Sequence, residues 1–446
     1  MRTKIRSLIF IICILLSTSL LLSSCYAEGS VGVVKARINE NGELILEYDN
    51  GSEQNLGVVT GQNGADGANG SDGEGYSGTI IVNSEKSNIS AASAKGLSNA
   101  VSITCNFKTT VQSGGGWRPN SQNTTTKDYS ASGSGVIYKL DKAEGDAFII
   151  TNYHVVYDAS SNTKNGISED IKVCLYGAEF DETAIEATYV GGSLYYDIAV
   201  LRIEDSEILK NSSATAIEIS DSDKVTVGEE AIAIGNAQGY GISASLGIVS
   251  VDSEYITMTA ADGKTSVSFR VMRIDTAVNS GNSGGGLYDG SGKLIGIVNA
   301  KIVEDGVENI GYAIPSNVAV SIADNIIDYC YQKDTERVQR AMLGIKVSTT
   351  DSKATYDSQT GRYEIKETVA VYEIINNSLS EGVMEIGDLL LSVTVNGKTS
   401  EITRQHHVID MMLDVRVGDV VTFNISRNGE IKTVSITITE DCLTEY

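Results

Sequence analysis

Three residues of this sequence have the types and the order of an activated nucleophile. Ser283 lies in the glycine-rich segment Gly-Asn-Ser-Gly-Gly, a turn that can expose a hydroxyl and aim backbone N–H groups at an anion. His154, one of three histidines, lies upstream, and Asp197 between them opens an apolar run. A serine hydroxyl is a weak nucleophile until a base takes its proton, so the set predicts a catalytic triad. Three other aspartates could orient the histidine, but none opens such a run: Asp158, Asp170 and Asp181.

The segments around these residues resemble the HtrA family of trypsin-like serine proteases, in which a catalytic domain precedes a PDZ domain. They occur in the family's order over about 180 residues: Gly133–Ile137, Thr151–Val156, Asp197–Leu201, Asp275–Gly285 and Asn309–Ser316. The resemblance implies that His154 is the base, Asp197 its orienting carboxylate and Ser283 the nucleophile. It also implies an oxyanion hole formed by the N–H groups of Gly281 and Ser283.

Three positions near the nucleophile affect how ordered the backbone of its turn is and which substrates the enzyme prefers. Ser280 and Gly286 stand where the family usually has prolines, which predicts a looser backbone around the oxyanion hole. Ala277 stands where trypsin-like enzymes have the base of the primary specificity pocket. Alanine offers no carboxylate to Lys or Arg, so we expect cleavage after small or medium aliphatic residues.

Residues 1–24 have the pattern of a secretory signal peptide, with basic residues before an apolar run at Leu8–Leu22. This run is short for a membrane-spanning helix. The following Leu-Ser-Ser-Cys segment, ending at Cys25, resembles the lipobox of bacterial lipoproteins. It implies a lipid on Cys25 and an extracytoplasmic protein anchored to a bacterial membrane. The alternative is an ordinary signal peptide followed by a chance cysteine.

Composition limits the partners of the chain. A formal net charge of −24 opposes binding to nucleic acid. Four cysteines remain beyond Cys25, at Cys105, Cys174, Cys330 and Cys442; they allow three pairings, and buried free thiols are slightly preferred. No Cys–His spacing suits a metal, so we expect no metal site and no cofactor.

Residues 25–98 are expected to form a flexible stalk. The segment Gly42–Gln54 alternates apolar and polar residues around Asn50-Gly51, which predicts a hairpin. Glycine then recurs at every third position over Gly61–Gly73. This spacing is typical of collagen, but without proline and over so few triplets a linker is favoured over a triple helix.

Residues 99–335 contain short Val-, Ile-, Thr- and Tyr-rich runs between turns, which predicts an all-β domain. The resemblance implies a chymotrypsin-like double β-barrel. We expect a long polar loop over Gln112–Ala131 between the first two strands, and a helix after Pro315 capped by Ser316.

Residues 338–442 are expected to form a small PDZ-like α/β domain. Met342-Leu343-Gly344-Ile345 resembles the carboxylate-binding loop of PDZ domains, which implies peptide binding at Leu343, Gly344 and Ile345. The alternative is an accessory domain without peptide affinity. His406 and His407 fall in this domain and are expected at its surface or groove.

The function expected from these patterns is a membrane-anchored serine endopeptidase that cleaves unfolded or misfolded proteins. The resemblance also implies a homotrimer, joined through Ile89–Asn99 just before the first barrel strand. Two alternatives remain. One is an inactive protease-like lipoprotein that serves as a peptide-binding scaffold, and the other is an adhesin that uses the glycine repeat.

Overall fold

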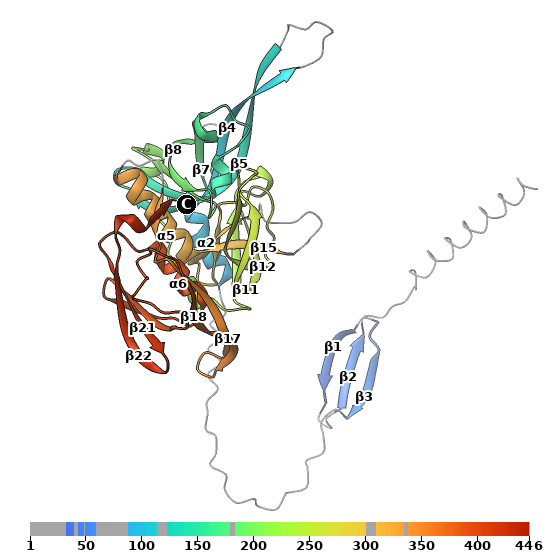
Figure 1. Cartoon of the computed structure of the whole chain (residues 1–446). Coiled ribbons are helices and arrows are strands. Elements are labelled where there is room, and N and C mark those ends of the chain that lie inside the picture. Colours follow the sequence, from blue (N-terminus) through green and yellow to red (C-terminus); the bar gives the residue numbers. More distant parts are fainter. Residues whose placement is uncertain are drawn as a thin grey trace, which may run out of the picture. The chain divides into compact units, whose positions relative to one another are not determined.

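The computed structural model describes residues 33–39, 43–48, 50–58, 88–113, 123–178, 183–299, 309–333 and 338–445 (Figure 1). It divides into two units, Met1–Asn83 and Ser84–Tyr446, which are described separately. The signal segment, Cys25, the glycine repeat and Asp181 lie outside the described residues. Among the described residues, no helix is both long and apolar enough to cross a membrane.

The described part of the first unit is an antiparallel three-stranded sheet in the order β1-β2-β3. Its strands are β1 (Val33–Ile38), β2 (Glu43–Tyr48) and β3 (Glu53–Val58). The predicted hairpin is present: Glu47 pairs with Glu53 across the turn, and Gly51 has the positive φ of 78° that such a turn needs. The sequence analysis did not anticipate β1.

The second unit begins with a helix and a closed six-stranded barrel in the order β4-β5-β6-β9-β8-β7. Alternate residues of β4 point inward and are buried, from Val101 to Phe107, as expected for a barrel strand. The elements are α2 (Ile89–Asn99), β4 (Ala100–Ser113), β5 (Asn123–Asp141), β6 (Asp146–Thr151), α3 (Tyr153–Val156), η1 (Lys164–Gly166), β7 (Asp170–Leu175), β8 (Ile185–Ser193) and β9 (Ile198–Ile203).

The expectation of a long loop over Gln112–Ala131 is wrong for most of that segment. Strands β4 and β5 stay paired as far as Ser113 and Asn123, so only residues 114–122 lie between them, outside the described part. The extended hairpin is polar because it projects beyond the barrel: Thr126, Lys127 and Asp128 are exposed. Threonine is β-branched and favours a strand even where neither face is buried.

A second closed barrel follows, in the order β10-β11-β12-β15-β14-β13. The two barrels confirm the predicted double-barrel fold. The elements are α4 (Glu207–Lys210), η2 (Ser222–Lys224), β10 (Glu230–Gly235), η3 (Ala237–Gly239), β11 (Ser243–Thr259), β12 (Ser266–Ile274), β13 (Gly286–Tyr288), β14 (Leu294–Val298) and β15 (Gly311–Pro315).

Helix α5 (Ser316–Ile326), continued by η5 (Ile327–Gln332), contacts β8 and β9 of the first barrel and β14 of the second. It therefore ties the two barrels together through its buried apolar face. Ser316 was expected to cap this helix, and that expectation is wrong. Pro315 occupies the N-cap position, while the Ser316 hydroxyl donates to the Ser220 carbonyl at 2.8 Å because the helix start is buried against that loop.

The C-terminal domain is a sheet in the order β17-β18-β19-β21-β22, with β20 beside β19, and a separate β16–β23 pair. Leu413 of this domain shares a buried cluster with Val318 and Ile322 of α5, so the domain packs against the protease barrels. The elements are β16 (Gln339–Ala341), β17 (Ile345–Asp357), β18 (Arg362–Ile374), β19 (Leu389–Val395), β20 (Lys398–Glu401), α6 (Gln405–Asp410), η6 (Met411–Leu413), β21 (Val420–Arg427), β22 (Glu430–Thr437), η7 (Glu440–Cys442) and β23 (Leu443–Glu445).

All four described cysteines are free thiols. Cys105 lies fully buried in β4, and burial, helped by the Asp170 carboxylate, raises its pKa to about 12. Because alkylation needs the thiolate, we expect iodoacetamide at about pH 8 to leave Cys105 unmodified in the folded protein and to modify it after denaturation. Peptide mass spectrometry measures this. The partly exposed Cys442 is the internal control, and equal rates for the two thiols would contradict the packing described here.

Candidate active site

The ends of two paired strands bring His154 and Asp197 together. Strand β6 ends at Thr151, which pairs with Ala199 near the start of β9. His154 follows β6 on the single turn α3, and Asp197 immediately precedes β9. Ser283 comes from the second barrel, in the turn before β13. The site therefore lies where the two barrels meet.

The three side chains form one continuous hydrogen-bonded chain. His154 Nδ1 lies 2.6 Å from Asp197 Oδ2, and His154 Nε2 lies 2.8 Å from Ser283 Oγ. Since a carboxylate only accepts, Nδ1 carries the imidazole proton and Nε2 is free to accept the serine proton. This is the tautomer that a general base for Ser283 requires.

Asp197 is held in one orientation by donors on both carboxylate oxygens. Its side chain is 8% exposed and its φ is +56°, an uncommon value for a residue with a Cβ. The His154 N–H donates to Oδ1 at 2.9 Å, and the Asn299 amide donates to Oδ2 at 2.8 Å. The Asn152 amide fixes the Asp197 backbone by donating to its carbonyl at 2.8 Å. The sequence analysis missed Asn152 and Asn299, since nothing in the sequence marks them among many asparagines.

The turn around the nucleophile depends on Gly281. It has φ +95°, and a Cβ there would lie 2.3 Å from the Asn236 carbonyl oxygen. Within the described part of the chain, the N–H groups of Gly281 and Ser283 donate to no protein acceptor. Two adjacent unpaired donors beside a nucleophile are what an oxyanion hole requires.

Ser134 of the first barrel clamps this turn. Its hydroxyl donates to the Gly281 carbonyl at 2.6 Å, and its N–H donates to the Ser283 carbonyl at 2.8 Å. Gln238 N–H adds a bond to the Ser280 carbonyl at 2.7 Å. The backbone that lacks prolines is therefore fixed by hydrogen bonds, and the expectation of a looser turn finds no support in these contacts.

Packing explains why glycine stands at position 286. A Cβ at this position would lie 2.4 Å from the ring of Tyr288, whose side chain is fully buried. Proline would meet the same ring. The Tyr288 hydroxyl hydrogen-bonds the Asn99 side chain at the end of α2, so glycine at position 286 makes room for a buried tyrosine that anchors this helix.

The other residues expected at the site lie as follows. Ala277 is exposed, and its carbonyl accepts from the Ser245 hydroxyl at 3.1 Å. Asp158 accepts instead from the Tyr129 hydroxyl at 2.6 Å, and Asp170 from the Asn106 amide at 2.8 Å. Neither aspartate contacts His154, so only Asp197 of the described candidates can orient it.

The PDZ-like loop leads into the edge strand β17. Gly344 has φ +78°, and the N–H groups of Leu343 and Gly344 donate to no acceptor among the described residues. Ile345 begins β17, whose only neighbour in the described sheet is β18. One edge of β17 is therefore open beside helix α6.

Comparisons with known proteins agree with this architecture. Residues 133–297 match the family model described as "Trypsin-like peptidase domain". This match and the two barrels identify the chain as a trypsin-like serine protease. The Serine protease Do-like HtrA of Lactococcus lactis subsp. lactis (strain IL1403) is 33% identical over 337 residues, which are 73% of this chain and 75% of that protein. The chain belongs to the HtrA family of serine proteases.

In other relatives, a smaller share of the relative's own length is matched by this chain. The Serine protease Do-like HtrA of Bacillus subtilis (strain 168) is 34% identical over 315 residues, covering 69% of this chain and 63% of that relative. Among solved structures, "HtrA-type protease AlgW with decapeptide" has 23% identity and a TM-score of 0.47 over 79% of this chain and 98% of that one.

The Gly281→Ala substitution tests the geometry of the turn. A methyl group would push against the Asn236 carbonyl and move the N–H groups, so we expect kcat to fall by about 10²–10³ with little change in KM. The matched control is Gly228→Ala in the same barrel, where φ is +92° but no atom lies within 4 Å of the new Cβ. Steady-state kinetics on a peptide substrate separate the two, and equal losses would show that backbone strain alone is responsible.

Proposed function

We propose that this protein is a serine endopeptidase that works through an acyl-enzyme. The observation that carries the proposal is the hydrogen-bonded chain from Asp197 through His154 to Ser283, next to two backbone donors without acceptors in the described structure. An inactive scaffold would need none of this alignment. The enzyme class agrees with that of the relatives, which are named serine proteases.

The first half-reaction transfers the acyl group to the enzyme. Ser283 Oγ attacks the carbonyl carbon of the peptide bond while His154 Nε2 takes the hydroxyl proton. The N–H groups of Gly281 and Ser283 stabilise the negative oxygen that forms. His154 then gives the proton to the leaving nitrogen, the C–N bond breaks, and an ester remains on Ser283.

The second half-reaction returns the enzyme to its starting state. Water attacks the ester carbonyl as His154 takes one of its protons, and the same proton goes back to Ser283 Oγ when the carboxylic acid leaves. Throughout both steps Asp197 keeps the Nδ1 proton in place and stabilises the transient imidazolium.

We propose unfolded or misfolded proteins as substrates, cut after small or medium aliphatic residues. Ala277 supports this specificity, because it brings no charge to the position where a carboxylate would select Lys or Arg. For the C-terminal domain we propose binding of peptide C-termini. The peptide would add as a strand to the open edge of β17, and its carboxylate would meet the N–H groups of Leu343 and Gly344.

We also propose that the mature protein is extracytoplasmic and held at a bacterial membrane through lipidated Cys25. The signal pattern and the lipobox-like segment support this anchoring, and one relative is named "Periplasmic serine endoprotease DegP". The helix Ile89–Asn99 before the first barrel strand is the segment through which we propose that a homotrimer assembles. Mass spectrometry of the mature N-terminus tests the lipid, and light scattering tests the trimer.

Digestion of denatured casein with mapping of the cut sites tests the proposed function. We expect internal cleavage, with most cuts after small aliphatic residues. A majority of cuts after Lys or Arg would overturn the specificity, and no cleavage by the folded protein would overturn the activity.

A further inference from the structure

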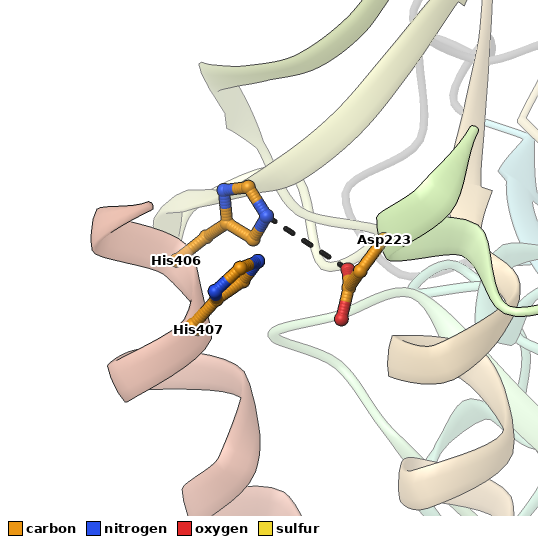
Figure 2. Close-up of side chains that lie close together, drawn as sticks. All are labelled: Asp223, His406 and His407. Atoms are coloured by element: carbon orange, nitrogen blue, oxygen red, sulfur yellow. Dashed lines mark ion pairs between the residues drawn. The ribbon is translucent and has the colours of Figure 1, made fainter. Parts of the chain in front are cut away.

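Helix α6 of the C-terminal domain faces the second barrel through a cluster of three potential metal ligands (Figure 2). His406 and His407 lie on α6, and Asp223 lies on η2 of the protease domain. One ligand atom from each residue lies within 4.8 Å of the other two, and His406 Nε2 is 3.8 Å from Asp223 Oδ1. His406 was expected at the surface or groove and is instead 5% exposed, because α6 packs against the barrel.

His407 is oriented as a metal ligand is. Its Nδ1 lies 3.3 Å from the Glu401 carbonyl oxygen, which can only accept, so Nδ1 carries the proton. The lone pair is then on Nε2, a buried atom with no hydrogen-bond partner in the described structure. A buried nitrogen without a partner is uncommon, and an outer carbonyl that fixes the tautomer is typical of a ligating histidine.

His406 presents its second nitrogen to the same point. Its Nδ1 lies 3.3 Å from the Ser253 hydroxyl, which leaves Nε2 facing Asp223. The two histidine rings are perpendicular, with centroids 4.7 Å apart, and do not stack on each other.

Two arginines lie near the cluster, and each is paired with two carboxylates. The Arg270 guanidinium lies 2.8 Å from the Asp223 carboxylate and 2.7 Å from the Asp410 carboxylate. The Arg404 guanidinium lies 2.8 Å from the Asp252 carboxylate and 3.5 Å from the Glu367 carboxylate. With every carboxyl group ionised, four carboxylates face two guanidinium groups, a formal excess of two negative charges. A divalent cation would balance them in a region where buried uncompensated charge is costly.

We propose that Asp223, His406 and His407 form a zinc site that joins the C-terminal domain to the protease barrel. Two imidazole nitrogens and one carboxylate oxygen are ligands that suit Zn²⁺, with a fourth position left for water. Asp223 has a 28% exposed side chain, so the ion has a route of entry. The ligand atoms must close to about 3.3 Å from one another. Asp223 Oδ1 accepts from Arg270 at 2.8 Å and Oδ2 accepts from the Asn317 amide at 3.0 Å, so the ion must share or replace one of these bonds. Bound zinc would hold α6 against η2 and so restrain the C-terminal domain.

The test is zinc titration of the full chain against a chromophoric chelator, with Ser283→Ala present in every sample to prevent self-digestion. We expect one zinc ion per chain. His406→Ala and His407→Ala should each weaken binding about a hundredfold or more, and Asp223→Asn about tenfold or more. The matched control is His154→Ala, which removes the only other histidine and should leave the affinity unchanged.

A second measurement needs no ligand variant and guards against misfolding. X-ray absorption on the zinc-loaded chain should show two imidazole nitrogens at about 2.0–2.1 Å. The proposal is overturned by any of three results: no site tighter than that of the His406→Ala/His407→Ala double variant, loss of binding only in His154→Ala, or a zinc spectrum without histidine scattering.

Discussion

Replacing Ser283 with alanine is expected to lower kcat for peptide hydrolysis by about six orders of magnitude. Among the described residues, Ser283 Oγ is the nucleophile in hydrogen-bond contact with the base, 2.8 Å from His154 Nε2. The N–H groups of Gly281 and Ser283 remain in the variant. A residual acceleration of about 10³ over the uncatalysed reaction should therefore persist.

Kinetics on a peptide substrate and digestion of casein both measure this loss. The matched control is Ser291→Ala, which removes an exposed turn hydroxyl in the same barrel and should leave turnover unchanged. Undiminished casein digestion by purified Ser283→Ala protein would remove Ser283 from the mechanism.

Replacing Asp197 with asparagine is expected to lower kcat about 10⁴-fold while the fold is retained. Both carboxylate oxygens accept from N–H donors: the His154 backbone N–H on Oδ1, and His154 Nδ1 with the Asn299 amide on Oδ2. An amide NH₂ in either place faces a donor. The histidine then loses the orientation and the tautomer that free Nε2 to accept the serine proton.

Asp158→Asn is the control for that variant. Asp158 is the rival aspartate nearest to the histidine in sequence, yet it bonds the Tyr129 hydroxyl at 2.6 Å and does not contact His154. Its replacement should leave turnover near that of the unsubstituted protein, with thermal unfolding used to check both folds. Equal losses from the two substitutions would mean that Asp197 has no special role.

The all-β character of residues 99–335 and the glycine-rich turn at Ser283 could be predicted because each depends on local pattern, whereas the double barrel came from the family resemblance. Strand runs show their alternation or apolar length, and a glycine-rich turn has a recognisable composition. The resemblance to one family supplied the pairing between distant segments. The sequence did not predict that Asn299 would bind Asp197 or that Ser134 would bind the turn at Gly281. These partners lie far apart in sequence, and asparagine and serine occur at many positions without a role in a site.

The contact between the C-terminal domain and the barrels was also beyond prediction from sequence. His406 was expected at the surface or groove of the PDZ-like domain, because the sequence does not show which other domain packs on it. It is buried against the protease domain, where Asp223 Oδ1 lies 3.8 Å from its Nε2 and the Ser253 hydroxyl lies 3.3 Å from its Nδ1. Both partners lie at least 153 residues away in the sequence. The prediction of a loop in place of the β4–β5 hairpin was wrong because composition suggested less regular structure than is present. The hairpin's polar composition predicts a loop, whereas strand pairing beyond the barrel needs no buried face.

Labelling with a serine-reactive phosphonate probe tests the central claim most directly. On the unsubstituted chain, peptide mass spectrometry should find one adduct, on Ser283, formed because His154 and the two N–H donors activate this serine alone. The adduct should be absent from Ser283→Ala and strongly reduced in His154→Ala. A chain that takes up no probe, or one labelled equally after Ser283 is replaced, would contradict the account.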